Sequence, residues 1–300
     1  MLPRILLGTL LLAGCEPTPP PHVPEVDAAR ALEYVRTQLD FGPRVPGTEG
    51  HRRMAAWLDS LLRTRADTVI VQAWDHTAVD GTVLPMRNLV ARFDLAATDR
   101  LLFLAHWDTR PRADAAGSSD PNAPVPGAND GASGVAVLLA MADALKAAPP
   151  GIGVDLLFVD GEDYGDFGVG RDVLIGSRYY AGNPMPGPKP RFAVLFDMVG
   201  DRDLQIYQEG NSLTGAPRVV ELVWRVAGEI GYRAQFPAEP RHTVTDDHVP
   251  LQQAGFQAID LIDFDYPWWH TPEDTFDKVS AESLKAVAEV GMALVRRKGR

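Results

Sequence analysis

Val159-Asp160-Gly161-Glu162-Asp163-Tyr164 is the stretch around which the rest of the sequence is organised. It stands at the end of a largely apolar run, residues 154–159, and this run predicts a buried strand. Glu162 and Asp163 therefore stand just past the carboxyl end of that strand, at the edge where ligand crevices form in open α/β sheets. Neighbouring residues in a turn point in different directions, so one carboxylate can hold a metal ion while the other moves protons. A solvated acidic turn is the alternative interpretation of the same residues.

Segments with strand and helix patterns alternate on both sides of this stretch. Apolar runs bounded by turn residues predict strands, and apolar residues at helical spacing predict helices. The sequence shows neither an internal repeat nor a second apolar core, so we expect one α/β domain. The expected strands are residues 68–77, 87–93, 101–105, 154–159, 192–196, 204–208 and 256–262, and the expected helices are residues 27–39, 48–63, 135–145, 175–181, 218–230 and 280–295.

The composition is that of a folded, acidic protein. The chain has 300 residues, of which 45% are hydrophobic, enough for one large core. Charged residues make up an ordinary 23%, so disorder is not expected. A net charge of −11 disfavours contact with a phosphate backbone, which excludes nucleic acid as the expected partner. The excess of acid suits cationic or amine-bearing substrates.

The first residues carry a targeting pattern. Arg4 is followed by an apolar run, residues 5–12, that is too short to cross a bilayer. Leu12-Ala13-Gly14-Cys15 comes next and resembles a bacterial lipoprotein signal, in which small residues precede a cysteine that becomes lipidated. Cys15 is the only cysteine of the sequence, so no disulfide framework is expected within the chain. An ordinary secretory signal with a chance cysteine is the alternative.

The lipoprotein pattern predicts three parts of the chain. They are a signal peptide (residues 1–14), a proline-rich tether that begins with the lipidated Cys15 (residues 15–25) and a folded domain (residues 26–300). Proline-rich segments are extended and semi-rigid, which suits a domain held away from a membrane. In bacteria with such signals, Glu16 rather than Asp after the cysteine favours the outer membrane. We therefore expect a lipid-anchored protein on the periplasmic face of the cell envelope.

Polar side chains collect where the predicted strands end. His and carboxylate groups are the ligands that zinc takes when thiolate is absent. Any one of these residues has a structural explanation, such as a helix cap or a turn former. Their joint occurrence at successive strand ends favours a single crevice that binds a metal ion. The residues are His106, Asp130, Glu162, Asp163, Asp197 and His270.

Several motifs occur in a fixed order over nearly everything after the tether. They are His106-Trp107-Asp108, Gly127-Ala128-Asn129-Asp130-Gly131-Ala132-Ser133-Gly134, Glu162-Asp163, Asp197, Asp246-Asp247-His248 and Trp269-His270-Thr271. The set resembles the zinc aminopeptidase-fold family, and within it the glutaminyl cyclases (glutaminyl-peptide cyclotransferases) of the bacterial lipoprotein type. The resemblance implies a three-layer α/β fold, with a mixed, twisted central β-sheet flanked by helices. The motifs are highly specific for this fold and less specific for the reaction.

Carried over residue by residue, the resemblance implies one catalytic zinc ion per chain, so that residues 26–300 would form a zinc-dependent catalytic domain. The residues that match its ligands are Asp130, Asp163 and His270. Glu162 matches the general base and acid, while Asp197 and Asp246 match carboxylates of a shared hydrogen-bond network. The sequence departs from the commoner Glu-Glu pair at Asp163, which is one methylene shorter. Zinc would therefore sit closer to the backbone or be bound differently.

The same motifs are compatible with two reactions. In aminopeptidases of this family, the residues that match His106 and Asp197 bind a second zinc ion, and this sequence has both. A two-metal aminopeptidase activates water, and its second metal holds the free amine of the substrate. A glutaminyl cyclase needs that amine as its nucleophile, so one zinc ion is enough and a second would interfere.

We therefore expect a cyclase that converts an N-terminal Gln to pyroglutamate and releases ammonia. A two-zinc aminopeptidase is the alternative. A non-catalytic surface protein on the same fold is a third, against which the complete ligand set argues.

Aromatic residues next to the ligands complete the expected site. Trp107, Trp268 and Trp269 are expected to wall a dry pocket for a small side chain, with core packing as the alternative. The expected partners are peptides or proteins with an N-terminal Gln, and the membrane through Cys15. A monomer is expected.

Overall fold

In the computed structural model, which describes residues 26–183 and 185–297, six strands form one mixed sheet. They are β1 (Thr68–Thr77), β2 (Val83–Phe93), β3 (Arg100–His106), β4 (Gly153–Val159), β5 (Ala193–Asp197) and β6 (Ala258–Ile262). Their order across the sheet is β1-β2-β4-β3-β5-β6. β2 pairs antiparallel with β1 and β4, whereas β4, β3, β5 and β6 run parallel. The carboxyl ends of these four strands therefore meet at one edge.

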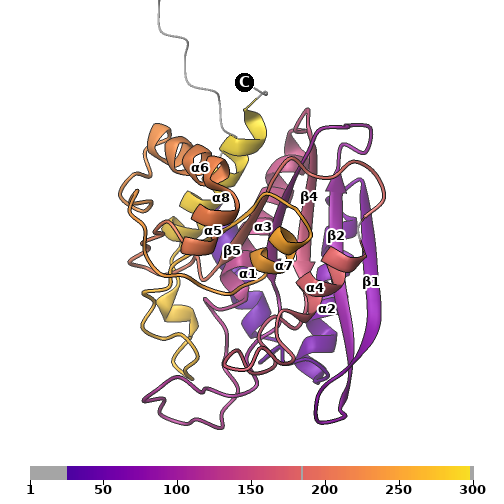
Figure 1. Cartoon of the computed structure of the whole chain (residues 1–300), viewed down its shortest axis with the longest axis vertical. Helices are drawn as coiled ribbons and strands as arrows, with labels where there is room; N and C mark the ends of the chain where they lie inside the picture. Colours follow the sequence, from indigo (N-terminus) through magenta and orange to yellow (C-terminus); the bar gives the residue numbers. More distant parts are fainter. Residues whose placement is uncertain (1–25, 184, 298–300) are drawn as a thin grey trace, which may run out of the picture.

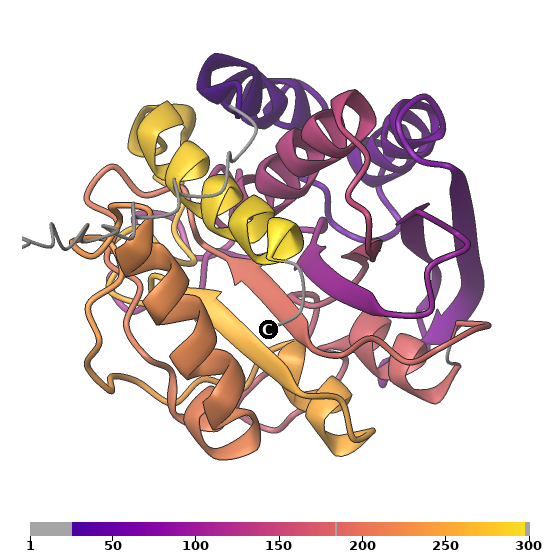
Figure 2. The ribbon, with the colours of Figure 1, turned by 90° about the horizontal axis from the view of Figure 1, so that it is seen from above.

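Helices cover both faces of the sheet (Figure 1). One face carries α1 (Ala28–Leu39), α2 (Glu49–Arg63), α3 (Ala132–Ala147) and α8 (Ala281–Arg296), and the other carries α4 (Ile175–Gly182) and α7 (His248–Gln253). α5 (Gly210–Gly215) and α6 (Pro217–Glu229) pack beside β6, the edge strand. Seen from above, the sheet runs between these layers (Figure 2). The expected three-layer α/β architecture is confirmed.

The core has two halves because side chains alternate between the faces along each strand. On β3, Leu101 and Phe103 pack into the larger cluster, which contains the apolar faces of α1, α2, α3 and α8. Leu102 and Leu104 point the other way, into a smaller cluster with Tyr180 of α4 and Leu251 of α7. Nearly every residue of α3 is buried, as its all-round apolar sequence predicts.

Local signals explain where several elements begin. Asp27, Thr48 and Ser280 cap α1, α2 and α8, each accepting a backbone N–H of the first turn through its side chain. The predicted hairpin turn joins β1 and β2, and Gly81 there has a φ of +87°, which glycine adopts without steric cost. These elements could be located from sequence because their signals are local.

Residues 204–208 do not form the predicted strand. Ile206 and Gln208 donate backbone N–H groups to the carbonyl oxygens of Gln235 and Glu239, but only one isolated bridge results, between Gln208 and Pro240. Leu204 and Ile206 are buried, so this apolar run packs against the core without joining the sheet. Two short helices, α5 and α7, were not predicted, because six residues are too few to show a helical period.

The predicted signal peptide, tether and lipidated Cys15 lie outside the described residues. Among the residues that the structure describes, no helix combines the length and the apolar character needed to cross a bilayer.

Candidate active site

The carboxyl edge of the parallel strands brings the predicted site residues together. His106 is the last residue of β3, and Asp197 is the last residue of β5. The turn after β4 carries the adjacent carboxylates, and the loops before α3 and after β6 supply the rest. All are buried: His106, Asp130, Glu162, Asp163, Asp197 and His270.

A first group of donor atoms belongs to Asp130, Asp163 and His270. One donor atom from each lies within 4.8 Å of the others. His270 Nε2 is 3.2 Å from Asp163 Oδ1 and 3.7 Å from Asp130 Oδ2. Oδ2 of Asp130 and Oδ2 of Asp163 are buried, and neither has a hydrogen-bond partner among the described residues. Buried carboxylate oxygens without donors call for a cation, and one His with two carboxylates fits zinc.

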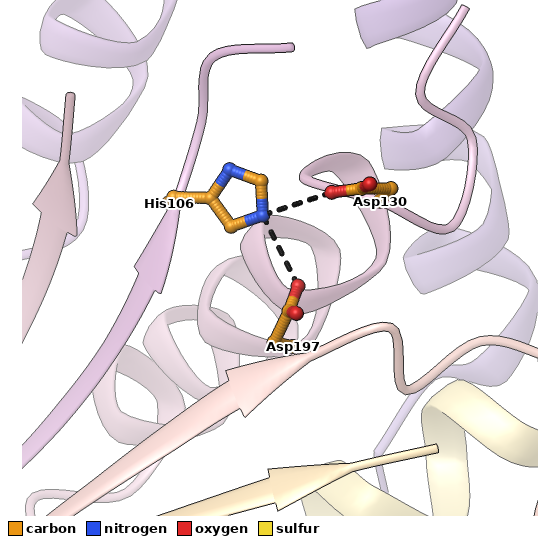
Figure 3. A group of neighbouring side chains, drawn as sticks. All are labelled: His106, Asp130 and Asp197. Carbon is orange, nitrogen blue, oxygen red and sulfur yellow. Dashed lines mark hydrogen bonds and ion pairs between the residues drawn. The ribbon is translucent and has the colours of Figure 1, made fainter. Parts of the chain in front are cut away.

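A second group joins His106, Asp130 and Asp197. His106 Nε2 lies 3.1 Å from Asp197 Oδ1 and 3.2 Å from Asp130 Oδ1. Figure 3 shows the imidazole at the end of its strand, facing Asp130 on one side and Asp197 on the other. Asp130 therefore belongs to both groups and presents a different oxygen to each histidine. Such a carboxylate can bridge two metal ions, or bind one metal and accept a hydrogen bond from His106.

Two segments of the site have left-handed backbone at residues other than glycine. φ is +54° at His270 and +46° at Met198, which directly follows Asp197. Such conformations cost about 1–3 kcal/mol and persist only where other contacts hold them. The backbone of His270 is held by Ala115, whose N–H donates to its carbonyl oxygen at 3.2 Å. Strain of this kind is common at functional sites.

Burial changes the acidity of the neighbouring carboxyl groups. Removal from water, reinforced by the charge of Asp246, raises the pKa of Glu162 well above its ordinary value. Burial and the charge of Asp197 raise the pKa of Asp246 to about 7, and burial also raises the pKa of Asp197. Carboxyl groups with pKa values raised in this way can hold and pass on a proton near neutral pH.

The pKa values of the two histidines are also raised, but by the neighbouring carboxylates and not by burial. Burial alone would lower the pKa of His106, but hydrogen bonds to three surrounding aspartates raise it well above its ordinary value. Burial also opposes protonation of His270, but the charge of Asp163 and a hydrogen bond to Asp114 raise its pKa to about 9. The carboxylates thus draw positive charge into the site, and a bound metal ion would take the place of such protons.

The three tryptophans have different surroundings, and Trp268 lies against Lys278, whose Nζ is 4.6 Å from the ring centroid. Trp268 and Trp269 are partly exposed, at 37% and 36%. Trp269 stacks on His270, with ring centroids 3.9 Å apart. Trp107 does not wall the pocket as the sequence suggested: it is fully buried, it stacks on His51 at 4.4 Å, and its indole N–H donates to a backbone carbonyl of β2. Trp107 belongs to the core.

Charged residues without an expected role support the donor atoms. Arg110 Nη1 donates to Asp163 Oδ1 at 2.9 Å. Its Nη2 donates to Asp114, which in turn contacts His270 Nδ1 at 3.1 Å. Asp108 accepts the backbone N–H groups of Glu162 and Asp163, both at 3.1 Å. The available signal was proximity in sequence, because Asp108 ends the motif His106-Trp107-Asp108 and Arg110 follows two residues later.

The sequence and the fold match known proteins. Aminopeptidase YwaD of Bacillus subtilis (strain 168) is 30% identical over 209 residues, 66% of this chain and 40% of that protein. The glutaminyl-peptide cyclotransferase-like protein of Mus musculus is 29% identical over 263 residues, 77% of this chain and 66% of that protein. The chain thus spans between 40% and 66% of the length of these two relatives.

Solved structures extend the similarity over nearly the whole chain. The glutaminyl cyclase of Bacteroides thetaiotaomicron, solved with N-acetylhistamine, matches with a TM-score of 0.89 and 37% identity, over 93% of this chain and 100% of that one. The predicted resemblance is therefore confirmed. The family model for peptidase family M28 matches residues 88–295, most of the sequence. The chain belongs to peptidase family M28.

Proposed function

We propose that this protein is a zinc-dependent glutaminyl-peptide cyclotransferase, which converts the N-terminal Gln of peptides or proteins to pyroglutamate and releases ammonia. The observation that carries the proposal is the group formed by Asp130, Asp163 and His270 beside the buried Glu162. Two carboxylate oxygens of this group have no hydrogen-bond partner in the part of the chain that the structure describes. The similarity to a bacterial glutaminyl cyclase over its full length supports the same reaction.

Asp130, Asp163 and His270 would hold one zinc ion per chain. A zinc ion bound there would act as a Lewis acid on the γ-carboxamide of the substrate. Trp269, stacked on His270, would wall the pocket for the Gln side chain.

Glu162 would move the proton. The neutral α-amine of the substrate, with an ordinary pKa of about 7.7–8.0, attacks the γ-carboxamide carbon and closes a five-membered ring. Glu162 takes a proton from the attacking amine and returns it to the departing nitrogen, so the C–N bond that breaks releases ammonia. Its raised pKa suits a group that both accepts and donates. Asp197 and Asp246 would orient this exchange through protons held between them.

A two-zinc aminopeptidase is a second candidate, favoured by one observation. His106, Asp130 and Asp197 form a complete additional donor group, with Asp130 placed to serve both. An aminopeptidase would use a second metal ion there to hold the substrate amine. That amine would then have no lone pair free for cyclisation.

One experiment separates the two reactions. The purified protein is incubated with a Gln-initiated peptide and with the same peptide starting with Leu, while zinc is counted by elemental analysis. The cyclase proposal expects ammonia and an intact, pyroglutamyl peptide from the first, no free amino acid from either, and about one zinc per chain. Free Leu together with two zinc ions would establish the aminopeptidase instead.

We also propose that Cys15 is lipidated and anchors the protein at the periplasmic face of the cell envelope, on the outer membrane. The support is the sequence Leu12-Ala13-Gly14-Cys15 followed by Glu16. Fractionation of cells that express the wild type and Cys15→Ser tests it. The wild type should sediment with outer membranes and the variant should not; equal sedimentation of both would refute the anchor.

A further inference from the structure

Both carboxylate oxygens of Asp274 accept hydrogen bonds from the loop that carries Asp130. Its Oδ1 accepts the backbone N–H of Asn129 at 2.8 Å, and its Oδ2 accepts that of Asp130 at 3.0 Å. The backbone carbonyl of Asp274 accepts the N–H of Ala128 at 3.2 Å. Asp274 is fully buried, and it comes from the loop after β6, four residues beyond His270. Three successive backbone N–H groups of the loop before α3 therefore donate to a single residue, Asp274, of the loop after β6.

The acceptor side of the same loop is held by Arg44. Its guanidinium donates to the carbonyl oxygens of Pro126 and Gly127, at 2.6 and 2.7 Å. Arg44 is also fully buried, so neither side of the loop can rely on water for its hydrogen bonds. The loop before α3 thus lies between a buried cation and a buried anion.

The hydroxyl of Tyr266 adds a further layer. It donates to Asp274 Oδ1 at 2.7 Å, so that this oxygen serves both the hydroxyl and the N–H of Asn129. The hydroxyl thereby helps to hold the carboxylate in the orientation in which it accepts the N–H groups of the loop. A chain of contacts runs from Tyr266 through Asp274 to the backbone of Asp130.

The other carboxylate of the proposed zinc site rests on a similar contact. Asp108 accepts the backbone N–H groups of Glu162 and Asp163, one on each oxygen. The two carboxylate donors, Asp130 and Asp163, are therefore supported in the same way. In each case another buried aspartate accepts the backbone N–H groups of the donor and of the residue before it. Backbone held in this way limits how far a donor oxygen can move.

We infer that Asp274 is a positioning residue for metal binding: by fixing the backbone of Asn129 and Asp130, it aims the free Oδ2 of Asp130 at the position beside His270. The inference rests on the proposed zinc donors but not on which reaction the protein catalyses. Asp274 is not a member of the donor groups found among the described residues. It would affect zinc affinity only through its hydrogen bonds with the backbone N–H groups of Asn129 and Asp130.

The test is the zinc affinity of Asp274→Asn, measured on the zinc-free full chain by competition with a chromophoric chelator. An amide can accept one N–H through its oxygen, but its NH₂ group would face the other N–H as a second donor. We expect the zinc dissociation constant to rise by about 10- to 100-fold, the usual effect of removing a residue that supports a ligand. Amide exchange of residues 128–131 in the zinc-free protein should also become faster.

Two further variants separate positioning from general damage. Asp277→Asn changes an exposed aspartate three residues further along the chain, in a short 3-10 helix, and should leave zinc affinity unchanged. Tyr266→Phe keeps both backbone hydrogen bonds and should weaken zinc binding by less than Asp274→Asn does. Should Asp274→Asn fail to fold, as judged by circular dichroism, Asp274→Glu takes its place: it keeps the charge but displaces the carboxylate by one methylene, and the same loss is expected.

A folded Asp274 variant whose zinc affinity stays within threefold of the wild type would overturn the inference. A wild type that binds zinc but releases no ammonia from Gln peptides would instead remove the proposed reaction and leave the role of Asp274 standing.

Discussion

Arg110 donates to both the side chain and the backbone of Asp163: its Nη1 lies 2.9 Å from Oδ1 and 3.1 Å from the carbonyl oxygen. One carboxylate oxygen of Asp163 is thus engaged by Arg110, while Oδ2 has no partner among the described residues. The same guanidinium donates twice to Asp114, at 2.9 and 2.5 Å. Arg110 therefore fixes the side chain of Asp163 through Oδ1 and leaves Oδ2 for a cation.

Replacement of Arg110 by Met should destabilise the zinc-free protein more than the zinc-loaded one. The side chain of Asp163 is only 1% exposed, and loss of one partner of a buried ion pair costs about 3–5 kcal/mol. Bound zinc would compensate the stranded carboxylate. We expect a loss of about 3 kcal/mol in the free energy of unfolding without zinc and a clearly smaller loss with it, measured by urea unfolding with and without a chelator.

The matched control for this change is Arg52→Met. Arg52 pairs with Glu49 on the surface, with side chains 59% and 68% exposed, so its loss should change stability by less than about 1 kcal/mol in either form. Equal losses for the Arg110 variant with and without zinc would contradict the role assigned to its charge.

Glu162→Gln should abolish the reaction while zinc stays bound. The substitution keeps the size of the side chain but removes the group that accepts and returns the proton, and Glu162 is not among the donor atoms of the zinc group. Ammonia release from a Gln peptide should fall by about 10²- to 10⁴-fold, with an unchanged zinc content. Glu273→Gln, which alters an exposed glutamate near His270, is the control. Full activity in the Glu162 variant would refute the proton transfer proposed for this residue.

Sequence patterns were sufficient for the residues whose position follows from strand ends. His106 and Asp197 close parallel strands, and this alone places them at one edge of the sheet. Trp107 was misplaced because successive residues of an extended segment point to opposite sides. Its neighbour His106 faces the site, so the indole faces the core.

Contacts between loops were beyond sequence patterns. Arg110 and Asp163 are 53 residues apart, and Asp274 is 144 residues from Asp130. Each contact depends on the path of a loop whose shape is set by buried hydrogen bonds, and no local period records it. The strand predicted over residues 204–208 was wrong for a related reason. An apolar run becomes part of a sheet only where its backbone can pair with a neighbouring strand, and the sequence pattern does not show this.

Glu209 should make the free energy of unfolding depend on pH in the acid range. Its side chain is almost fully buried and accepts the backbone N–H groups of Asn211, Ser212 and Val244. Burial opposes ionisation, but the contact with His248 and these hydrogen bonds lower its pKa from 4.5 to about 2. Because the folded-state pKa lies below the unfolded one, the ionised group stabilises the fold above about pH 5, and this contribution is lost as the pH falls toward 2.

The variant Glu209→Gln tests this dependence. A pKa lowered by roughly two to three units corresponds to about 3 kcal/mol, so the variant should unfold more easily than the wild type by about that amount at pH 7. At about pH 3 the difference should be much smaller, because the wild type has then lost most of the same contribution. Urea unfolding at the two pH values measures it, with the exposed Glu33→Gln as control. A difference that does not change with pH would contradict the assignment.

His106→Gln should separate the one-metal site from the two-metal site. If His106 only hydrogen-bonds to Asp130 and Asp197, zinc content stays at about one per chain in both the wild type and the variant. Activity should nevertheless fall by about 10- to 100-fold, because both carboxylates lose the partner that orients them. Elemental analysis and ammonia release are measured on the same preparation.

The control for His106→Gln is His76→Gln, because His76 also pairs with an aspartate, Asp172, with Nε2 and Oδ1 2.9 Å apart. His76 and Asp172 do not belong to the donor groups found among the described residues, so His76→Gln should keep zinc content and activity. Two zinc ions in the wild type and one in His106→Gln would show that His106 is a ligand. In that case the substrate amine would have a metal to bind, and the aminopeptidase would replace the cyclase as the function that the site supports.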